Sequence, residues 1–442
     1  MNCFSAIAMT LSWKCLTRRR TSQLLGLALV GLLLGTTSCG GSGNSGAASN
    51  EIEFWTMQLQ PKFTDYFNAL IADFEQANPE LTVKWVDVPW NAMESKILAA
   101  VSANTAPDVV NLNPAFASQL ASKDAWLNLE EALPAEEKAK YLPNIWQAST
   151  IGDLSFGFPW YLTTRVTIYN QEILEEAGIE TPPQTYEELA AVAKQIRDKT
   201  GKYAFFMTAV PEDSAELLES MVQMGVTLVD AEGKAAFNSP EGKAAFQYWV
   251  DLYQNKLLPQ EVLTQGHSRA VELYQAGQTA VLSSGAEFLN AIATNAPQVA
   301  EVSAASPQIS GSTNRKNVAV MNLVIPKGTD NPDGAVKFAL YVTNSQNQLA
   351  FARDANVLPS TQESLADYQA SLEALGQGAS AVEQARAVSA GQMSNAEVLV
   401  PAMRDLNQLK QAIYENLQAA MLDEKNVEEA LSDAEAQWNG RS

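Results

Sequence analysis

The sequence predicts an α/β fold of two lobes, and three observations support this. The chain has 442 residues with 46% apolar side chains, which is enough for a large core and suggests two domains. Strand-like and helix-like segments alternate over residues 51–112, a pattern typical of right-handed crossover units and a parallel sheet. Residues 157–170 combine Pro159, two aromatic residues and a β-prone run, so we interpret them as a strand leading from one lobe into the other.

The first 38 residues have the three regions of a secretory signal. Basic residues precede an apolar run over residues 24–34, which is too short for a comfortable membrane span, and small residues follow. The run ends on Cys39, which resembles a bacterial lipobox cysteine; the alternative is a free thiol beside a cleavage site. We expect a signal peptide over residues 1–38, and a lipidated Cys39 with a flexible Gly/Ser/Ala/Asn tether over residues 39–50.

Cysteine and charge patterns describe the exported part. All three cysteines lie in the leader or at its end, so the mature body has no internal disulfide. Removal of the leader leaves 25 basic and 50 acidic side chains, a net charge of −25. Such a surface repels nucleic acid, although solubility alone explains the charge. We therefore expect an exported monomer, periplasmic or on the outer face of the cytoplasmic membrane, with no nucleic-acid partner.

The elements before residue 157 follow from hydrophobic periodicity. Ligands bind beyond the carboxyl ends of parallel strands, where this sequence places Trp55, Trp90 and Asn113. We expect strands over residues 51–55, 81–86 and 108–112, and helices over residues 63–75 and 92–104.

The elements after residue 170 show the same mixture and end in helices. Thr185 and Glu188 form a capping box, because each side chain can satisfy a backbone donor at a helix start. The remainder, residues 346–438, is mostly helical. We expect strands over residues 202–207, 277–285 and 318–325, and helices over residues 171–177, 186 onward, 240–255, 269–276 and 333–343.

Six short phrases, found in family order, resemble the extracellular solute-binding proteins of ABC importers, in the large carbohydrate-binding group that includes the maltose-binding protein. One is Pro107-Asp108-Val109, which matches the family's Pro-Asp-Val signature, and another is Pro159 with Tyr169-Asn170. Each phrase is weak alone, but six in order are strong evidence. They lie at residues 74–80, 107–110, 158–170, 183–189, 274–281 and 357–360.

The resemblance implies the two-lobed periplasmic-binding-protein fold, type II-like, with two mixed sheets flanked by helices and three interlobe crossings. A ligand that touches both lobes binds the closed form better and shifts the population toward it, which a permease can recognise. The crossings are expected near residues 161–166, 280–283 and 325–329. The first lobe is expected to hold residues 51–160 plus 284–325, and the second residues 166–280 plus 330–442 with C-terminal helices.

The cleft chemistry expected for a sugar guides the choice of ligand-binding residues. Aromatic rings cover the C–H face of a sugar, while amides, carboxylates and guanidinium groups bind its hydroxyls. The candidates are Trp55, Gln58, Trp90, Asn113, Trp160, Tyr161, Thr164, Arg165, Ser284, Gly285, Glu287, Phe288, Met321 and Asn322.

Each candidate also has a plain structural explanation. Trp55, Trp90 and Trp160 could pack in the core instead, Arg165 could pair with a neighbouring carboxylate, and Asn322 could cap a backbone group. We assign Trp160 to the cleft and expect Trp160→Ala to weaken ligand binding more than folding.

The sequence gives little support for catalysis or metal binding. His267 is the only histidine, so the chain cannot supply a His-x-x-x-His zinc pair, and His267 is expected in a surface loop beside Gly266. The acid pairs Glu130-Glu131 and Glu187-Glu188 fall at helix starts, where their charge favours the helix dipole. We expect no catalytic residue, no metal and no cofactor.

The leading hypothesis is a non-enzymatic lipoprotein that captures a small carbohydrate (a mono-, di- or oligosaccharide or a glycosyl polyol) and passes it to an ABC permease. A second hypothesis keeps the fold and changes the ligand to a quaternary amine, a polyamine or a sugar phosphate. A third is an extracellular glycoside hydrolase or an adhesin-like surface protein.

Overall fold

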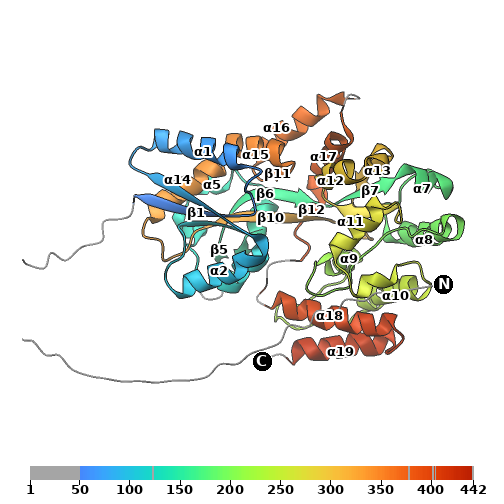
Figure 1. Cartoon of the computed structure of the whole chain (residues 1–442). Helices are drawn as coiled ribbons and strands as arrows, with labels where there is room; N and C mark the ends of the chain where they lie inside the picture. Colours follow the sequence, from blue (N-terminus) through green and yellow to red (C-terminus); the bar gives the residue numbers. More distant parts are fainter. Residues whose placement is uncertain (1–49, 122–123, 377–378, 401–402, 404, 441–442) are drawn as a thin grey trace, which may run out of the picture. The chain divides into compact units, whose positions relative to one another are not determined.

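The computed structural model describes residues 50–440 apart from 122–123, 377–378, 401–402 and 404, as one compact unit with two main sheets (Figure 1). The expected signal peptide, the lipidation residue Cys39 and all but the last residue of the expected tether lie outside the described residues. Within the described part of the chain, no helix combines the length and apolarity needed to span a bilayer.

The large sheet belongs to the first lobe and begins as the alternating pattern predicts. The strand order is β11 (Leu358–Pro359), β6 (Phe158–Thr164), β10 (Lys316–Val324), β3 (Val109–Leu112), β1 (Glu51–Met57) and β2 (Thr82–Val88), and β12 (Ala396–Glu397) pairs with β10. β1 pairs in parallel with both β2 and β3, while β10 runs antiparallel to β3 and β6, so the sheet is mixed.

Helices cover this sheet, and apolar side chains fill the two resulting layers. One layer holds Phe54, Phe67, Phe74 and Phe338, and the other holds Trp126 and Phe156. Figure 1 shows α1, α14 and α15 together on one side of the strands. The helices are α1 (Thr64–Ala77), α2 (Trp90–Ser102), α3 (Pro114–Ala121), α4 (Leu129–Ala132), α5 (Ala135–Lys138), α6 (Pro143–Ala148), α14 (Pro332–Val342), α15 (Ser345–Ala355) and α16 (Gln362–Glu373), with a hairpin of β4 (Thr150–Ile151) and β5 (Leu154–Ser155).

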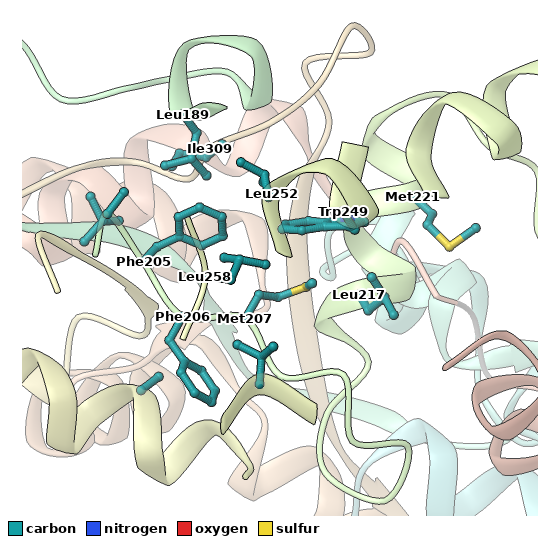
Figure 2. Close-up of a cluster of buried hydrophobic side chains, with 14 of the residues drawn as sticks. Leu189, Phe205, Phe206, Met207, Leu217, Met221, Trp249, Leu252, Leu258 and Ile309 are labelled. Atoms are coloured by element: carbon teal, nitrogen blue, oxygen red, sulfur yellow. The ribbon is translucent and has the colours of Figure 1, made fainter. Parts of the chain in front are cut away.

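The second lobe contains a small antiparallel sheet in the order β8 (Val281–Ser284), β7 (Val166–Asn170) and β9 (Ser303–Pro307). Its core gathers around Trp249, Phe205 and Phe206 (Figure 2). Its helices are α7 (Gln171–Glu176), α8 (Tyr186–Thr200), α9 (Glu216–Gln223), α10 (Pro240–Gln254), α11 (His267–Gln275), α12 (Phe288–Asn295), α13 (Pro297–Glu301), α17 (Ala381–Gly391), α18 (Leu406–Met421) and α19 (Val427–Asn439), with short 3₁₀ turns η1 (Gln260–Leu263) and η3 (Gln392–Asn395).

Most predicted elements are present, and the Thr185–Glu188 capping box at the start of α8 is confirmed. The strand predicted over residues 202–207 is wrong. Tyr203 makes an isolated bridge with Thr279, and the backbone carbonyls of Tyr203 and Ala204 accept bonds from Ala280 and Val281, so this segment borders β8 without forming a strand.

Two of the three expected crossings are misplaced. The first is confirmed, because β6 lies in the large sheet and β7 in the small one, with Arg165 between them. Residues 280–283 instead belong to β8, which pairs with β7 inside the second lobe. Residues 325–329 stay in the first lobe, where Ile325 accepts a backbone bond from Leu127. The chain returns between β9 and β10, over residues 308–315. It then passes from α16 to α17 in the second lobe, comes back to β12 in the large sheet, and leaves again for α18.

The division of the chain between the lobes differs from the expectation for the same reason. Residues 284–307, expected in the first lobe, pair with β7 or pack in the second core. Residues 332–372, expected in the second lobe, pack against the large sheet. The spacing of apolar residues along a helix does not reveal which of the two cores the helix joins. The lobe assignments of residues 284–307 and 332–372 were wrong because they followed from the two misplaced crossings.

Buried amide side chains join several of the segments that connect the lobes. Gln392, in η3, donates through Nε2 to Thr164 Oγ1 at 2.8 Å and to the Arg165 carbonyl at 2.7 Å. Its Oε1 accepts from the Gln308 backbone N–H at 3.1 Å. Asn317 donates its backbone N–H to Gln308 Oε1 at 2.7 Å and accepts from Leu399 N at 3.3 Å. Hydrogen bonds therefore join the segments that connect the two lobes to one another.

Candidate functional site

In the part of the chain that the structure describes, side chains of both lobes together line three cavities. The apolar cavity has a volume of about 440 Å³, the polar cavity about 230 Å³ and the outer cavity about 520 Å³. The apolar and polar cavities share Thr163, Glu219, Asn317 and Ala319 as lining residues, so they are two halves of one depression.

The first-lobe side of the apolar cavity combines residues that follow strands with residues of β6 and β10. Trp90 begins α2 directly after β2 and is 44% exposed, with its ring centroid 6.1 Å from that of Phe116. Asn113 follows β3 and caps α3, its Oδ1 accepting from Phe116 N at 2.8 Å. Tyr161 of β6 and Met321 of β10 also line this cavity. Val398, Val400 and Leu406 add further apolar side chains to its lining. An exposed indole beside an amide is a surface suited to a sugar ring.

The polar cavity surrounds the first crossing and is lined by Thr164, Arg165, Ser284, Glu287 and His267, among others. Thr164 is buried and bonded to Ser389 Oγ at 2.7 Å and to Gln392, so its hydroxyl already has partners. Gly285 and Phe288, also expected from sequence, line the same cavity.

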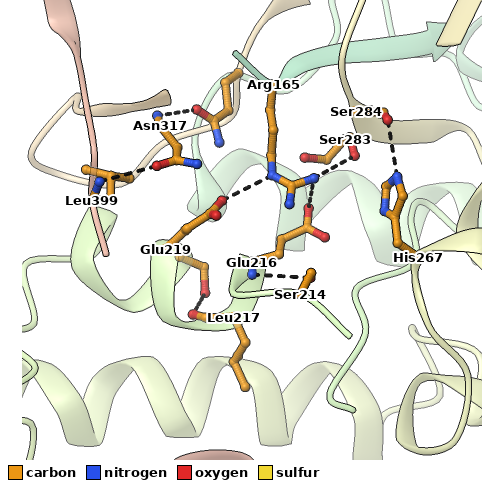
Figure 3. Close-up of polar contacts among 12 residues, drawn as sticks. Arg165, Ser214, Glu216, Leu217, Glu219, His267, Ser283, Ser284, Asn317 and Leu399 are labelled. Atoms are coloured by element: carbon orange, nitrogen blue, oxygen red, sulfur yellow. Dashed lines mark hydrogen bonds and ion pairs between the residues drawn. The ribbon is translucent and has the colours of Figure 1, made fainter. Parts of the chain in front are cut away.

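Arg165 binds two carboxylates of α9 (Figure 3). Its Nε donates to Glu219 Oε2 at 3.1 Å, its Nη1 lies 3.9 Å from Glu216 Oε1, and Nη1 also donates to the Ser283 carbonyl at 3.5 Å. Burial alone lowers the pKa of Arg165, but the two carboxylates outweigh it and raise the pKa. Burial raises the pKa of Glu219 above its usual value, and Arg165 counteracts this only in part. The sequence alternative, a pairing of Arg165 with carboxylates, is the observed arrangement.

His267 was expected in a surface loop, and this is wrong. It is the first residue of α11 and half-buried, and its Nε2 lies 3.1 Å from Ser284 Oγ (Figure 3). Its ring makes an edge-to-face contact with Phe288, with the ring centroids 5.8 Å apart. Burial lowers the pKa of His267, which favours the neutral ring. A neutral imidazole in this position can either donate or accept a hydrogen bond.

Trp160 does not lie in the cleft. It is 1% exposed and stacks on Phe351 at 5.0 Å with an interplanar angle of 22°. Side chains of a strand alternate between its two faces, so β6 directs Phe158, Trp160 and Leu162 into the core and Tyr161 toward the cavities. The assignment of Trp160 to the cleft is therefore wrong, and the aromatic residue of β6 that lines the cavities is its neighbour Tyr161.

Three other candidates lie outside the lining of the three cavities. Asn322 is fully buried and accepts from Ser149 Oγ at 2.6 Å, since it follows a register shift within β10. Trp55 is buried against the second layer of the first core, with Lys96 Nζ 4.0 Å from its ring centroid. Gln58 is exposed, and its Oε1 accepts from Trp90 N at 3.4 Å, so it supports the start of α2.

Sequence reasoning missed Glu216, Glu219 and Asn317. The sequence did hold a signal for the two acids, because they interrupt an apolar run, and the structure shows that every residue of this helix, α9, is buried. Asn317 gave no comparable signal. Among the residues that the structure describes, no group of three or more His, Cys, Asp or Glu side chains is arranged to hold a metal ion.

Two lobes, linked crossings and cavities between them define a binding protein with an interlobe site. Residues 60–349 match the family of bacterial extracellular solute-binding proteins, and the chain belongs to this family. The resemblance noted in the sequence is thereby confirmed.

Solved structures give the same fold. A candidate oligosaccharide periplasmic-binding protein from Synechococcus sp. MITs9220 is 46% identical, with a TM-score of 0.83, covering 88% of this chain and 98% of that chain. A second structure of that protein, in complex with zinc, has a TM-score of 0.82. The cyclic α-maltosyl-1,6-maltose binding protein of Arthrobacter globiformis is 22% identical, with a TM-score of 0.76, covering 88% of this chain and 98% of that chain.

A curated relative is more distant in sequence. The diacetylchitobiose binding protein DasA of Streptomyces coelicolor is 23% identical over 361 residues, which are 78% of this chain and 83% of that protein.

Proposed function

We propose that the protein is the solute-binding component of an ABC importer, which captures a carbohydrate between its lobes and delivers it to a membrane permease. The observation that carries this proposal is the pairing of an aromatic wall, formed by Trp90 and Tyr161, with an adjoining polar cavity lined by both lobes. A sugar presents C–H faces and hydroxyls together, and this pairing offers a partner to each. The carbohydrates named for relatives from Streptomyces and Arthrobacter agree with it.

We place the ligand contacts on those sequence candidates that line the apolar and polar cavities, apart from Thr164 and Arg165, whose polar groups are already bonded within the protein, and we add residues from α9, α11 and β10. A ligand held by Trp90 on one side and by Ser284 on the other touches both lobes, and therefore stabilises the closed form relative to the open one. The proposed contacts are Trp90, Asn113, Tyr161, Met321, Ser284, Gly285, Glu287, Phe288, Glu219, His267 and Asn317.

Calorimetry and thermal-shift measurements across a sugar panel test the carbohydrate ligand. We expect at least one sugar to bind at micromolar Kd or tighter and to raise the melting temperature, because a ligand specific for the folded state stabilises it. We also expect that sugar to be recovered chemically unchanged, as for a carrier. Absence of any sugar binding, together with binding of another solute class, would contradict the proposal.

Trp90→Ala tests the proposed aromatic contact. Loss of an indole that covers a sugar face is expected to weaken binding about tenfold, equivalent to about 1.4 kcal/mol, with little effect on stability because Trp90 is 44% exposed. Leu422→Ala is the matched control, since Leu422 is a similarly exposed apolar residue at 49% and lies after α18, outside the lining of the three cavities. Equal affinities of wild type and Trp90→Ala, measured by calorimetry, would move the site away from α2.

Among the non-sugar ligands, the charged residues that line the cavities favour a cationic solute over a sugar phosphate. Arg165 is already bound by two carboxylates, whose negative charges oppose the binding of a phosphate beside it. Glu219 and Glu287 beside Phe288 and Tyr161 suit a cationic solute better. A quaternary amine or polyamine included in the same panel separates this alternative from the carbohydrate.

We further propose that residues 1–38 direct export and that lipid on Cys39 anchors the protein at the outer face of the cytoplasmic membrane. The apolar run, the small residues and the following Gly/Ser tether support this. Cys39→Ser is expected to release the exported protein into the soluble fraction, while ligand affinity stays unchanged. Fractionation followed by immunoblotting measures this, and membrane retention of Cys39→Ser at the wild-type level would refute the anchor.

A further inference from the structure

His267 lies in the wall of the polar cavity and is the only histidine of the chain. It begins α11 and is half-buried, and Figure 3 shows its ring turned toward Ser284. Its Nε2 lies 3.1 Å from Ser284 Oγ, and the ring of Phe288 makes an edge-to-face contact with the imidazole. Ser284 and Phe288 line the same cavity, so a ligand held there lies beside the imidazole as well.

The immediate surroundings of the imidazole suit its neutral form. A neutral ring can donate to the Ser284 hydroxyl or accept from it. Asp213 accepts through Oδ2 from the backbone N–H of His267 at 2.9 Å, and within the described part of the chain no carboxylate forms an ion pair with the ring itself. A protonated ring without such a partner depends on water for its stability.

The other charged groups near His267 come from three segments. Glu216 and Glu219 of α9 are both bound to Arg165 of the first crossing. Glu287, directly before α12, lines the same cavity as His267. Burial lowers the pKa of His267, nearby carboxylates oppose this, and Arg165 adds to the lowering. The ring is therefore neutral at neutral pH, although acids surround the cavity.

A ligand in the polar cavity removes the water on which a charged imidazole depends. The cavity has a volume of about 230 Å³, so a sugar unit bound there displaces much of its water. Sugar hydroxyls offer hydrogen bonds but no negative charge, and ligand binding therefore costs more free energy when His267 is protonated. By linkage, a ligand that prefers the neutral ring also lowers the pKa of His267.

We propose that His267 is a pH switch of the ligand site: its neutral form binds a carbohydrate together with Ser284, and its protonation weakens that binding. This inference rests on the proposed carbohydrate function and deepens it by describing how the site is regulated. Binding releases a proton wherever His267 is charged in the free protein. The carbohydrate is therefore held most tightly at neutral and alkaline pH, and affinity falls as the pH falls through the pKa of His267 in the free protein.

Nuclear magnetic resonance of the imidazole tests the switch in the wild-type protein. Because His267 is the only histidine, protein with isotope-labelled histidine and no histidine tag gives one imidazole signal, whose titration measures the pKa of His267 directly. The probe is whichever of glucose, maltose, maltotriose, cellobiose, sucrose and trehalose binds most tightly. We expect the pKa of His267 to be lower in the sugar-saturated protein than in the free protein. An unchanged or raised pKa would overturn the switch.

Calorimetry with the same sugar at pH 7.5 and at pH 5 measures the effect on affinity. In wild type we expect a Kd about three- to tenfold higher at pH 5, since a pKa lowered by one unit corresponds to at most a tenfold change. His267→Gln keeps an uncharged donor and acceptor and is expected to lose this difference, whatever its absolute affinity. His267→Asn is the second substitution if His267→Gln melts at a lower temperature than wild type. Glu287→Gln is the matched control, because it removes a titrating group of the same cavity and should retain the difference.

The outcomes separate the two proposals. Equal wild-type affinities at the two pH values overturn the switch and leave carbohydrate binding intact. The same holds for a pH dependence that persists in His267→Gln, which would assign it to a carboxyl group. Failure of every sugar to bind wild type overturns the proposed function and the switch together.

Discussion

Replacing Trp160 by alanine is expected to lower the free energy of unfolding by about 3–5 kcal/mol, the usual cost of emptying a large aromatic site in a core. Trp160 is 1% exposed, stacks on Phe351 and contacts the rings of Phe54 and Phe67 at 6.4 and 5.9 Å. The cavity left behind cannot collapse easily because β6 is bonded to strands on both sides. Urea denaturation measures the loss.

Tyr161→Ala is the matched control, one residue along on the other face of the same strand. It is expected to cost less stability, because Tyr161 lines two cavities, and to weaken ligand binding more. In Trp160→Ala the folded fraction should keep its ligand affinity. A stable Trp160→Ala protein that no longer binds ligand would restore the sequence-based expectation and remove Trp160 from its structural role.

This pair of residues shows how far the sequence could be interpreted. The phrase Phe158-Pro159-Trp160-Tyr161 correctly located a crossing with an aromatic surface. Two adjacent aromatic residues are equally suited to core and cleft, however, and only the register of β6 against β10 decides which ring faces which way. The same limit applies to Asn322, which a register shift in β10 places in the core.

Long-range pairing explains the remaining differences. The segments with a clear period, such as α1, β2 and β3, lie within a few residues of the predicted ranges. The crossings do not, because a strand that stays within a lobe and one that leaves it have the same local pattern. Glu219 lies 54 residues from Arg165 in the chain, and Gln392 lies 227 residues from it, so the partners of Arg165 could not be identified from local sequence patterns.

Arg165→Met is the second substitution expected to have a large effect. It removes the charge that compensates Glu216 and Glu219, whose side chains are only 12% and 10% exposed. Removing one partner of a buried ion pair typically costs about 3–5 kcal/mol, since the other charge stays buried and unpaired. Arg165→Lys keeps the charge but loses the paired donor geometry, so its loss should be smaller.

The pH dependence identifies the cause of that loss. Burial already raises the pKa of Glu219, and Arg165 counteracts the rise. Without Arg165 this pKa rises further in the folded state, while the unfolded value stays near the usual 4.5. The folded variant then binds more protons than the unfolded chain between these two values, so its stability increases as the pH falls through the raised folded pKa.

Urea denaturation of wild type, Arg165→Met and Arg165→Lys at pH 8 and at pH 5.5 measures this effect. The stability difference between wild type and Arg165→Met is expected to be largest at pH 8 and to shrink at pH 5.5, as protonation removes the unpaired charge. The double variant Arg165→Met with Glu219→Gln should recover part of the loss at pH 8, because the pair can be replaced more cheaply than it can be broken. An equal loss at both pH values, with no recovery in the double variant, would mean that Arg165 acts through packing of its side chain and not through its charge.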